Sequence, residues 1–549
     1  MKRLRVMTSI GAVGALTLLL LPLQGCTNLD EVPTSNITPG TFFRNQAEVL
    51  AGLAGVYAQL RYAFPGYGFG SAYYTLSEIT TDEMVVPTRG QDWYDNGRWL
   101  EIHRQTWTAT SPSGLGDINN AWVNDFTGIA DANVVLAALA NRTVMDPAQQ
   151  ATVVAELRAL RAFYYYQLMD LFGGVPIVTT TDVKPRQRES RDSVFKFIEN
   201  ELLAARADLP KQWGDTTLLG TKVGRVTRGA VDAILASMYL NAGVFTKDVA
   251  GAGGFSATTY NSCSGIQVSG NIDACTAALN RADSIITSGV YGLASSFSQN
   301  FTADNAASPE NIFVVKFIAA DGLGFPLLQA TLHYYQFTPG PWNGFSTLAQ
   351  TYYAFDTLND RRSNIFLRGP QVNLETGTPV CFRPGCDKGA PRLVFTPTIA
   401  DVKAANEGEG LRIYKWPYDP KHVAQNNGND FAYFRLAEIY LIKAEAELNG
   451  ASGTPDQLTL VKTVRARAFP GGDTLSAVDL NAILRERLFE LTFEAKRRQD
   501  LVRFGQYTQA WQFKSAGADN LVLMPIPQTQ IDANPMLCQN PGYGAPACP

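Results

Sequence analysis

The chain has 549 residues, of which 17% are charged and 46% are hydrophobic, and its formal net charge at pH 7 is -4. These values predict a globular protein with a sizeable core, and they exclude the basic surface that nucleic-acid binding needs. The chain has 3 histidines, and it contains neither an HExxH zinc motif nor a GxSxG nucleophile elbow. We therefore expect no catalytic residues and no metal site.

The N-terminal residues carry targeting information. Residues 1–25 combine a basic start, a short apolar run and small residues before a cysteine, which is typical of a signal peptide. The ending Leu23-Gln24-Gly25-Cys26 resembles a bacterial lipobox, which implies cleavage before Cys26 and lipidation of its thiol. An ordinary secretory signal is the alternative. Residues 26–45 suit a lipidated tether. The acidic pair Asp30-Glu31 resembles a surface-export signal, although a solvated linker would look the same.

The helices of the scaffold begin after this tether. Apolar residues recur at steps of three and four from Gln46 to Leu60, which predicts an amphipathic helix. Asp146, Pro147 and Gly173 match the start and end preferences of a later helix. Successive helices of this kind are typical of antiparallel pairs stacked into a solenoid, and we describe them as tetratricopeptide-like. The same periodicity predicts the later helices at about 117–140, 148–172, 191–208, 227–242 and 275–288.

Residues 62–116 interrupt the helical pattern. Tyrosines and tryptophans stand here among Gly, Asp, Thr and Pro, and long irregular segments between helices are commonly binding loops. Gly66, Gly68 and Gly70 lack the spacing of a dinucleotide fingerprint and the Lys-Ser/Thr ending of a phosphate loop. A nucleotide site is therefore excluded.

A large loop-rich insert occupies residues 289–430. Asn311–Phe317 is β-branched and aromatic and predicts a short strand, while its surroundings are rich in Gly, Pro, Asn and Tyr. Leu332–Gly344 is a second concentration of aromatic residues, on a backbone made irregular by Pro339 and Pro341. Two aromatic loops separated by a helical scaffold can converge in space.

The helical pattern returns near the C-terminus, at 435–448, about 455–468 and 481–505, before a tail of extended and turn-forming segments. The stretch 481–505 combines dense charge with an apolar stripe, which predicts one unbroken helix ended by Gly505. A row of glutamates runs along it, formed by Glu486, Glu490 and Glu494. Arginines and lysines stand between them, where they are placed for cross-turn ion pairs. We interpret this row as a structural salt-bridge network rather than a catalytic site, because its partners neutralise it and no His or Cys stands nearby.

The cysteines other than Cys26 form local pairs: Cys263 with Cys275, Cys381 with Cys386, and Cys538 with Cys548. An even number in an exported chain predicts disulfides. Half of a metal site is the alternative for the second pair, but no further pair or His cluster stands near it. Because the pairs close short loops in Gly-rich segments, we expect them to staple surface excursions rather than the core.

Several motifs, in order along nearly the whole chain, resemble the SusD/RagB family of nutrient-binding outer-membrane lipoproteins. They are the lipobox, Tyr433–Ala446, Val464–Ala468, Glu486–Glu494 with Arg498–Gly505, and the ending from Met524 to Tyr543. The resemblance implies a mainly α fold, a SusD-like α-solenoid of tetratricopeptide-like helix pairs with a large irregular loop-rich insert and few short strands. It implies a single body, 46–549, made of a helical scaffold at about 46–288 and 431–505, a loop-rich binding half at about 289–430 and an extended tail, 506–549.

The resemblance also implies a function. Family members capture oligosaccharides, or in some branches peptides, and pass them without chemistry to a SusC-like TonB-dependent outer-membrane transporter, over which they sit as a lid. We therefore expect a lipid-anchored outer-membrane protein that faces the cell exterior and needs no cofactor.

The aromatic loops are the predicted ligand site, because sugar rings present C–H patches that stack on exposed aromatic faces while polar side chains orient the hydroxyls. The alternative for each ring is a place in the core. Three other functions remain as alternatives. Peptide capture would need backbone-like hydrogen bonding and charged rims, and a protein-interaction scaffold would bury the rings. A glycoside hydrolase, the most distant hypothesis, needs two carboxylates placed across a sugar bond. The residues selected are Trp93, Tyr94, Asn96 and Trp99 in the first loop and Tyr334, Tyr335 and Trp342 in the second.

Overall fold

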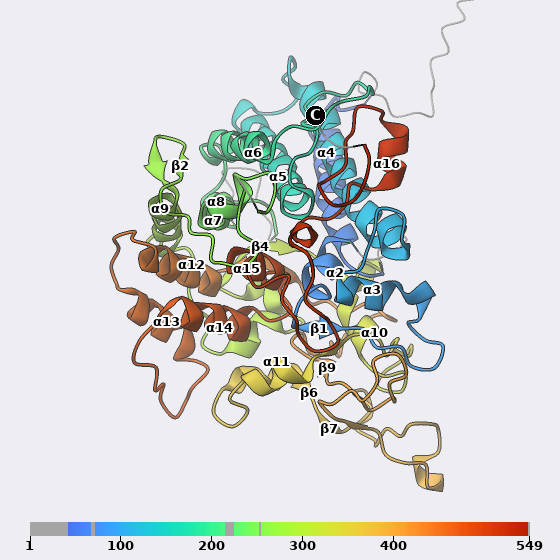
Figure 1. The fold of residues 1–549 in the computed structure, drawn as a ribbon. Helices are drawn as coiled ribbons and strands as arrows, with labels where there is room; N and C mark the ends of the chain where they lie inside the picture. The colour runs from blue at the N-terminus through green and yellow to red at the C-terminus, as the bar shows by residue number, and fades with distance from the viewer. Residues whose placement is uncertain (1–41, 67–71, 215–223, 252–253, 547–549) are drawn as a thin grey trace, which may run out of the picture.

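A computed structural model describes residues 42–66, 72–214, 224–251 and 254–546 (Figure 1). The fold is mainly helical with few short strands, as predicted. The signal peptide, Cys26 and nearly all of the tether lie outside the described residues, so what the sequence predicts for them stays a prediction. Within the described part of the chain, no helix combines the length and the apolarity that crossing a membrane requires.

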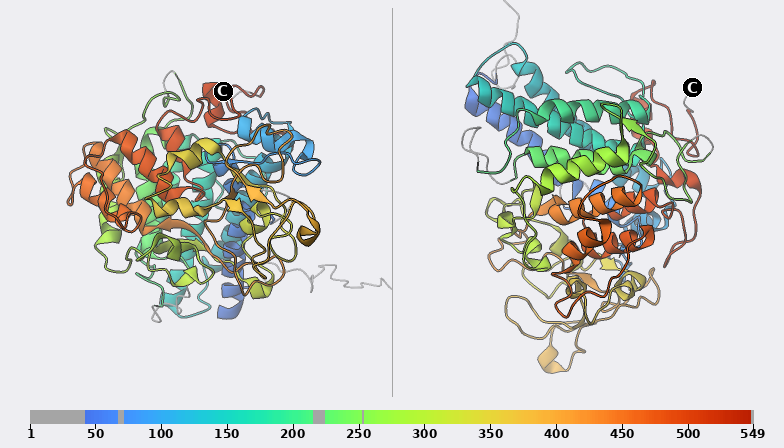
Figure 2. Two further views of the ribbon diagram at one scale, coloured as in Figure 1. Left: turned by 90° about the horizontal axis from the view of Figure 1, so that it is seen from below. Right: turned by 90° about the vertical axis from the view of Figure 1, so that its left-hand side faces the viewer.

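The scaffold helices stack as successive layers, which the right-hand view of Figure 2 shows from the side. Most scaffold helices pack against the helix that follows them in the chain. The helices predicted between residues 117 and 288 begin and end within about two residues of their expected bounds. The scaffold comprises α1 (Gln46–Gln59), α4 (Asn119–Leu139), α5 (Pro147–Phe172), α6 (Arg191–Arg206), α7 (Arg228–Leu240), α8 (Ala242–Phe245), α9 (Ala274–Ile286), α12 (Leu436–Leu448), α13 (Gln457–Arg465), α14 (Leu480–Leu491) and α15 (Arg497–Arg503).

Local chemistry explains the bounds of α5, the central helix. The Asp146 carboxylate accepts hydrogen bonds from the backbone N–H groups of Ala148 and Gln149, at 3.0 and 3.1 Å, and Pro147 occupies the first turn. Gly173 leaves the helix with a φ of 74°, a conformation that favours glycine. The side chains from 159 to 172 are all buried, because α4 and α6 pack against this helix from either side.

The loop-rich half lies at the lower right of Figure 1. A four-stranded antiparallel sheet in the order β1-β5-β9-β6 joins the early irregular segment to the insert, with Met84 opposite Thr347 and Val85 opposite Ser346. This pairing holds the two aromatic-rich segments in one place. The short elements here are α2 (Tyr73–Glu78), β1 (Met84–Val85), α3 (Arg98–Arg104), α10 (Leu327–Thr331), β5 (Ser346–Thr347), α11 (Ala349–Ala354), β6 (Phe366–Leu367), β7 (Gly369–Pro370), β8 (Val394–Phe395) and β9 (Arg412–Ile413).

The predicted strand at Asn311–Phe317 is present as β4 (Asn311–Val315). Its antiparallel partner, β10 (Phe431–Arg435), is missing from the sequence-based expectations, because its apolar run leads without a break into α12. Both strands are buried along their whole length. A further hairpin, β2 (Gln267–Val268) with β3 (Ile272–Asp273), precedes α9.

The prediction of one unbroken helix over 481–505 is wrong. The chain forms α14 and α15, and between them Phe493 and Ala495 have φ values of 68° and 59°. Buried carboxylates on and after α2 stabilise this break: Glu83 accepts a hydrogen bond from the Phe493 N–H at 2.8 Å, and Glu78 accepts one from the Ala495 N–H. A helical pattern in sequence cannot reveal such acceptors, since they lie about 410 residues away.

The expectation of cross-turn ion pairs for the glutamate row is also wrong. All three glutamates are buried, and their cationic partners come from the insert, β10 and the region around α13. The ion network therefore joins separate elements of the fold, and its role is structural, as interpreted from the sequence. Glu486 pairs with Arg362 and Arg465, Glu490 with Arg362, Arg435 and Arg467, and Glu494 with Arg435 and Lys415.

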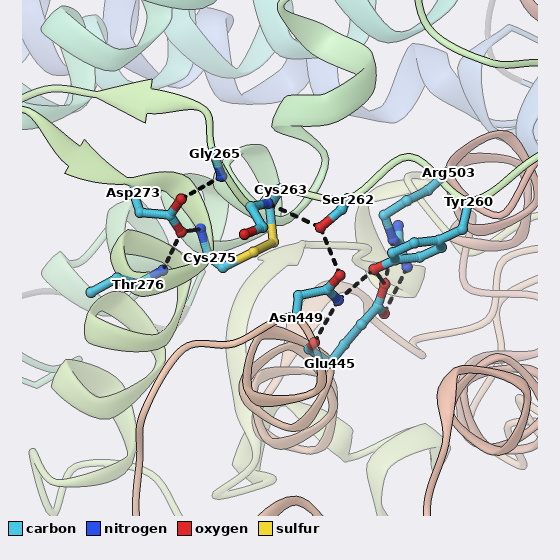
Figure 3. Close-up of a disulfide and its surroundings, with 11 residues drawn as sticks. Tyr260, Ser262, Cys263, Gly265, Asp273, Cys275, Thr276, Glu445, Asn449 and Arg503 are labelled. Carbon is cyan, nitrogen blue, oxygen red and sulfur yellow. Dashed lines mark hydrogen bonds and ion pairs between the residues drawn. A yellow bond between two sulfur atoms is a disulfide. The ribbon is translucent and has the colours of Figure 1, made fainter.

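The disulfide between Cys263 and Cys275 is present, but both residues are fully buried, so the expectation of a surface staple is wrong for this pair. Figure 3 shows that the chain just before Cys263 binds the end of α12. The Ser262 hydroxyl donates to Asn449 Oδ1 at 2.7 Å, and the nearby Tyr260 hydroxyl donates to a carboxylate oxygen of α12 at 2.9 Å. This disulfide thus fixes the start of α9 against α12.

The second predicted disulfide, Cys381–Cys386, is also present and closes an exposed loop. Cys538 is disulfide-bonded, whereas its predicted partner Cys548 lies outside the described residues. No cluster of three or more potential metal-ligating side chains occurs in the described ranges.

The C-terminal tail lies across the helical half and includes α16 (Gln528–Ala533). The Met524 N–H donates to the Leu171 carbonyl near the end of α5 at 2.8 Å, and the side chains of Met524 and Ile526 are fully buried. The tail is therefore part of the core packing.

Candidate ligand-binding site

The two aromatic loops predicted from the sequence meet in the structure. The Trp93 indole N–H donates to the Trp342 carbonyl at 2.6 Å, although 249 residues separate them. The Tyr334 hydroxyl donates to a carboxylate oxygen of Asp92, which again joins the later loop to the earlier one. We call the three rings of Trp93, Tyr334 and Trp342 the aromatic platform.

Two buried rings support the aromatic platform. Trp99 and Phe345 lie with their ring centroids 5.1 and 5.5 Å from that of Trp93, and they are 5.6 Å from each other. Trp99 is 2% exposed and Phe345 is 0% exposed. Aromatic pairs in edge-to-face contact are stabilised beyond the burial of their area, so this base holds Trp93 firmly. Trp99 itself is placed in the core and cannot offer a face to a ligand.

The backbone around Trp93 is strained. Trp93, Asp95 and Asn96 have φ values of 60°, 40° and 56°, in the left-handed region that bulky side chains rarely adopt. The opposite loop makes room for the indole with a glycine, since a Cβ on Gly344 would lie 2.3 Å from Trp93 Cε2. Strain of this kind persists only where the surroundings over-determine it, and it clusters at binding and active sites.

The other predicted residues lie beside the aromatic platform in different ways. Tyr94 and Asn96 are exposed on the turn that carries Trp93, with 56% of the tyrosine accessible. Tyr335 is 40% exposed and follows Tyr334, and their ring centroids are 6.4 Å apart. The structure therefore brings together Trp93, Trp99, Tyr334, Tyr335 and Trp342 around one position, with Tyr94 and Asn96 at the outer edge.

Two buried arginines fix the second loop from behind. Arg89 Nη1 donates to the carbonyls of Asn343 and Gly344, at 2.9 and 3.0 Å, and Arg412 Nη2 donates to Asn343 Oδ1 at 2.7 Å. Burial lowers the pKa of Arg89 to about 10, and burial together with the Arg89 charge lowers the pKa of Arg412. These guanidinium groups hold the turn at Asn343, which has a φ of 54°, and so fix the position of the neighbouring Trp342.

Two carboxylates provide hydrogen-bond acceptors near the aromatic platform. Asp92 is exposed, and the Glu407 side chain is 33% exposed, with Oε2 held by the Asn343 amide and lying 3.2 Å from His333 Nε2. Burial would raise the pKa of Glu407, but the hydrogen bond and charge of His333 outweigh it, so the net pKa is lowered. Partial burial and the Asp92 hydrogen bond raise the pKa of Tyr334, so its hydroxyl remains a donor.

The pairing of His333 with Glu407 does not make a catalytic site. The His333 side chain is fully buried, and this burial lowers its pKa below the ordinary value. Both ring nitrogens face protein groups: Nδ1 lies 3.4 Å from the Tyr335 backbone nitrogen, and Nε2 lies 3.2 Å from the Glu407 carboxylate. The pair instead positions the loop beneath Tyr334.

Arg89, Asp92, Glu407 and Arg412 are missing from the sequence-based site. Asp92 had a usable signal, because it precedes Trp93 directly and a carboxylate beside a tryptophan suits sugar recognition. The sequence offers no such signal for Glu407 and Arg412, since they stand in a Gly- and Asn-containing stretch about 70 residues from the second loop.

Comparison with known proteins places this architecture in a family. The sequence pattern of the SusD family matches residues 396–543, and a second pattern, described as starch-binding and associating with the outer membrane, matches residues 65–240. The chain is a SusD/RagB family protein. Glycan-binding proteins of the SusD family are non-catalytic, which confirms the prediction that the chain is not an enzyme.

Individual SusD proteins are similar over nearly the whole chain. The starch-binding protein SusD of Bacteroides thetaiotaomicron is 26% identical over 87% of this chain and 86% of its own length. The SusD-like protein P2 of Formosa agariphila is 24% identical over 96% of this chain and 98% of its own length. A laminarin binding SusD-like protein has the same fold, with a TM-score of 0.67 and 22% identity over 91% of this chain and 100% of that chain.

Proposed function

We propose that this SusD/RagB family protein captures oligosaccharides at the cell surface on the aromatic platform and delivers them to a SusC-like TonB-dependent transporter. The observation that carries the proposal is the meeting of two aromatic loops across a hydrogen bond from the Trp93 indole to the Trp342 carbonyl, at 2.6 Å. Such an arrangement presents rings from two directions to one ligand.

The chemistry of this surface suits a sugar. Rings stack on the C–H faces of pyranoses, and carboxylates such as Asp92 and Glu407 accept hydrogen bonds from their hydroxyls. Fixed donors and acceptors behind the rings keep the site pre-formed, which lowers the entropy cost of binding. Relatives named for starch and for laminarin, and a structure of similar fold in complex with laminarihexaose, support an oligosaccharide ligand.

Calorimetry with laminarihexaose, maltohexaose and a panel of short peptides tests the ligand class. We expect an oligosaccharide to bind, and Trp342→Ala to weaken its affinity at least about 10-fold, because the truncation removes a stacking face while the backbone carbonyl that accepts from Trp93 remains. Trp93→Ala should weaken binding by a similar factor.

Tyr353→Ala is the matched control, since this ring is 65% exposed on α11 and lies outside the aromatic platform. Its oligosaccharide affinity should equal that of the wild type. Equal affinity in the Trp93 and Trp342 variants as well would refute the site, and binding of peptides alone would favour the peptide-capturing alternative.

The location and the partner have their own tests. Protease added to intact cells should digest a surface-exposed protein, and Cys26→Ser should release it from the membrane fraction if the cysteine carries the lipid. When the tagged protein is purified from outer membranes in mild detergent, a TonB-dependent transporter should co-purify with it and be identified by sequencing. Recovery without any such transporter would contradict the delivery step.

A further inference from the structure

A small cavity lies where three scaffold helices meet, between the end of α6, the start of α7 and the end of α9. α7 and α9 lie at the left of Figure 1, whereas α3 and α10, next to the aromatic platform, lie at the right. The volume of the cavity is about 230 Å³, and no residue of the candidate ligand-binding site lines it. Its charged lining residues are Arg206, Lys211, Arg228 and Asp232.

The guanidinium group of Arg228 is held at the cavity by neutral partners. Its Nε donates to the Leu209 carbonyl at 2.8 Å, and its Nη2 donates to the Ala207 carbonyl at 3.0 Å. These bonds satisfy the last carbonyls of α6, and they fix the group without compensating its charge. Lys211 follows on the same turn and is exposed. In the part of the chain that the structure describes, neither Arg228 nor Lys211 forms an ion pair.

The carboxylate of Asp232 is shared by two arginines. Arg206 donates to its two oxygens with Nε and Nη2, at 2.8 and 2.9 Å, and Arg281 Nη1 lies 3.2 Å from Oδ1. Asp232 is 2% exposed, so these partners enclose it. The Arg206 side chain remains 33% exposed. Because the lining residues carry three cations and one carboxylate, positive charge remains at the cavity.

The cavity suits a tetrahedral oxyanion. Arg206, Arg228 and Lys211 come from the end of α6, the first turn of α7 and the connecting turn, so they offer donors from several directions. A sulfate or phosphate group has three or four oxygens for such donors, whereas a carboxylate has two. Val290 and Tyr291 form an adjoining apolar wall. The cavity is smaller than the roughly 300–1,000 Å³ typical of sites for drug-sized ligands, so it fits one charged group rather than a whole oligosaccharide.

We propose that this cavity binds a sulfate or phosphate group, as the free ion or as the ester group of a sugar, through Arg206, Lys211 and Arg228. The apolar wall then contacts the sugar ring of an ester. The cavity does not include the aromatic platform, so binding here is independent of stacking there. Since the cations are partly exposed to solvent, the affinity should fall as salt is added.

Calorimetry at low salt with the purified full-length protein tests the proposal, using glucose 6-sulfate, inorganic sulfate and inorganic phosphate, with glucose as the uncharged control. Lys211→Gln should weaken binding of the anions at least about 5-fold, and Arg228→Gln at least about 10-fold, because each removes a charged donor. Lys196→Gln is the matched control and should bind as the wild type does, since Lys196 is a 65% exposed cation on α6 that does not line the cavity.

The three anions distinguish the sources of the group. Binding of inorganic sulfate or phosphate without glucose 6-sulfate would assign the cavity to a free ion, and tighter binding of glucose 6-sulfate would assign it to an ester. Trp342→Ala should leave these affinities unchanged. A loss in that variant would place the anion on the aromatic platform and overturn the proposal, as would the absence of anion binding or equal affinity in the wild type, Lys211→Gln and Arg228→Gln.

A second measurement does not depend on substitutions. Acetylation of lysines by N-hydroxysuccinimidyl acetate, followed by mass spectrometry, reports the accessibility of each amine. A saturating concentration of the anion that binds should slow the acetylation of Lys211 several-fold and leave that of Lys196 unchanged. Equal rates for Lys211 with and without the anion would refute the site. Thermal unfolding checks each variant, and Lys211→Gln decides the calorimetry if Arg228→Gln does not fold.

Discussion

The ion network around α14 and α15 and the aromatic platform use side chains in opposite ways. In the network, Glu490 is 0% exposed and binds three arginines that belong to different elements. At the aromatic platform the rings are partly accessible, and their polar partners lie behind them. Dense charge therefore marks the scaffold of this molecule, whereas the accessible rings on a strained backbone mark the surface that is free to bind.

The largest effect should come from breaking the network at its centre. Glu490→Ala leaves Arg362, Arg435 and Arg467 buried with fewer anionic partners, and we expect the free energy of unfolding to fall by about 3–5 kcal/mol. Urea denaturation measures this change. Arg485→Ala on the exposed face of the same helix is the control and should stay within about 0.5 kcal/mol of the wild type.

Glu490→Ala should also leave oligosaccharide affinity unchanged in the fraction of the protein that remains folded. A loss of affinity without a loss of stability would show that the network takes part in binding.

A second, smaller effect concerns pH. Burial raises the pKa of Glu83 from 4.5 to about 7. Between these values the unfolded chain has released its proton while the folded chain still holds it, so stability should fall as pH rises, by on the order of 3 kcal/mol. The glutamine of Glu83→Gln cannot ionise and still offers an oxygen to the Phe493 N–H, so the free energy of unfolding of this variant should change less between pH 4.5 and 7 than that of the wild type. Urea denaturation across this range compares the two, and parallel curves would contradict the assignment.

The smallest effect tests the aromatic platform. Tyr334→Phe removes the hydroxyl that donates to Asp92 but keeps the ring. We expect a stability loss of about 1 kcal/mol together with a several-fold weaker oligosaccharide affinity, because the two loops lose one of their connections. Differential scanning calorimetry and titration calorimetry measure the two quantities. A loss of stability with no change in affinity would mean that the ring, without its hydroxyl, is sufficient for binding.

Much of the scaffold is predictable from the sequence because its causes are local. Asp146, Pro147 and Gly173 set the bounds of α5 through contacts with their own neighbours. The break after α14 is not local: Phe493 adopts its conformation next to Glu83, and a periodic apolar stripe continues through it. The same holds for the buried disulfide: Cys263 is fully buried next to Ser262, whose hydroxyl binds Asn449 at the end of α12, and its Gly-rich surroundings do not reveal this contact.

The candidate site is predictable in part for the same reason. Aromatic residues are visible in any sequence, so Trp93, Tyr334 and Trp342 stand out as a group. Their relative positions depend on β1 pairing with β5 and on the two arginines behind the second loop, which no spacing reveals. Trp99 shows the limit most clearly, since its place in the core follows from a neighbour, Phe345, that belongs to the other loop.

The hydrogen bond from the Trp93 indole to the Trp342 carbonyl also limits how the protein can be re-engineered. Because Gly344 accommodates the indole of the other loop, grafting either loop alone from a relative with a different ligand would leave a cavity or a clash at this contact. Ligand preference should therefore be exchanged between relatives only when both loops are transplanted as one unit.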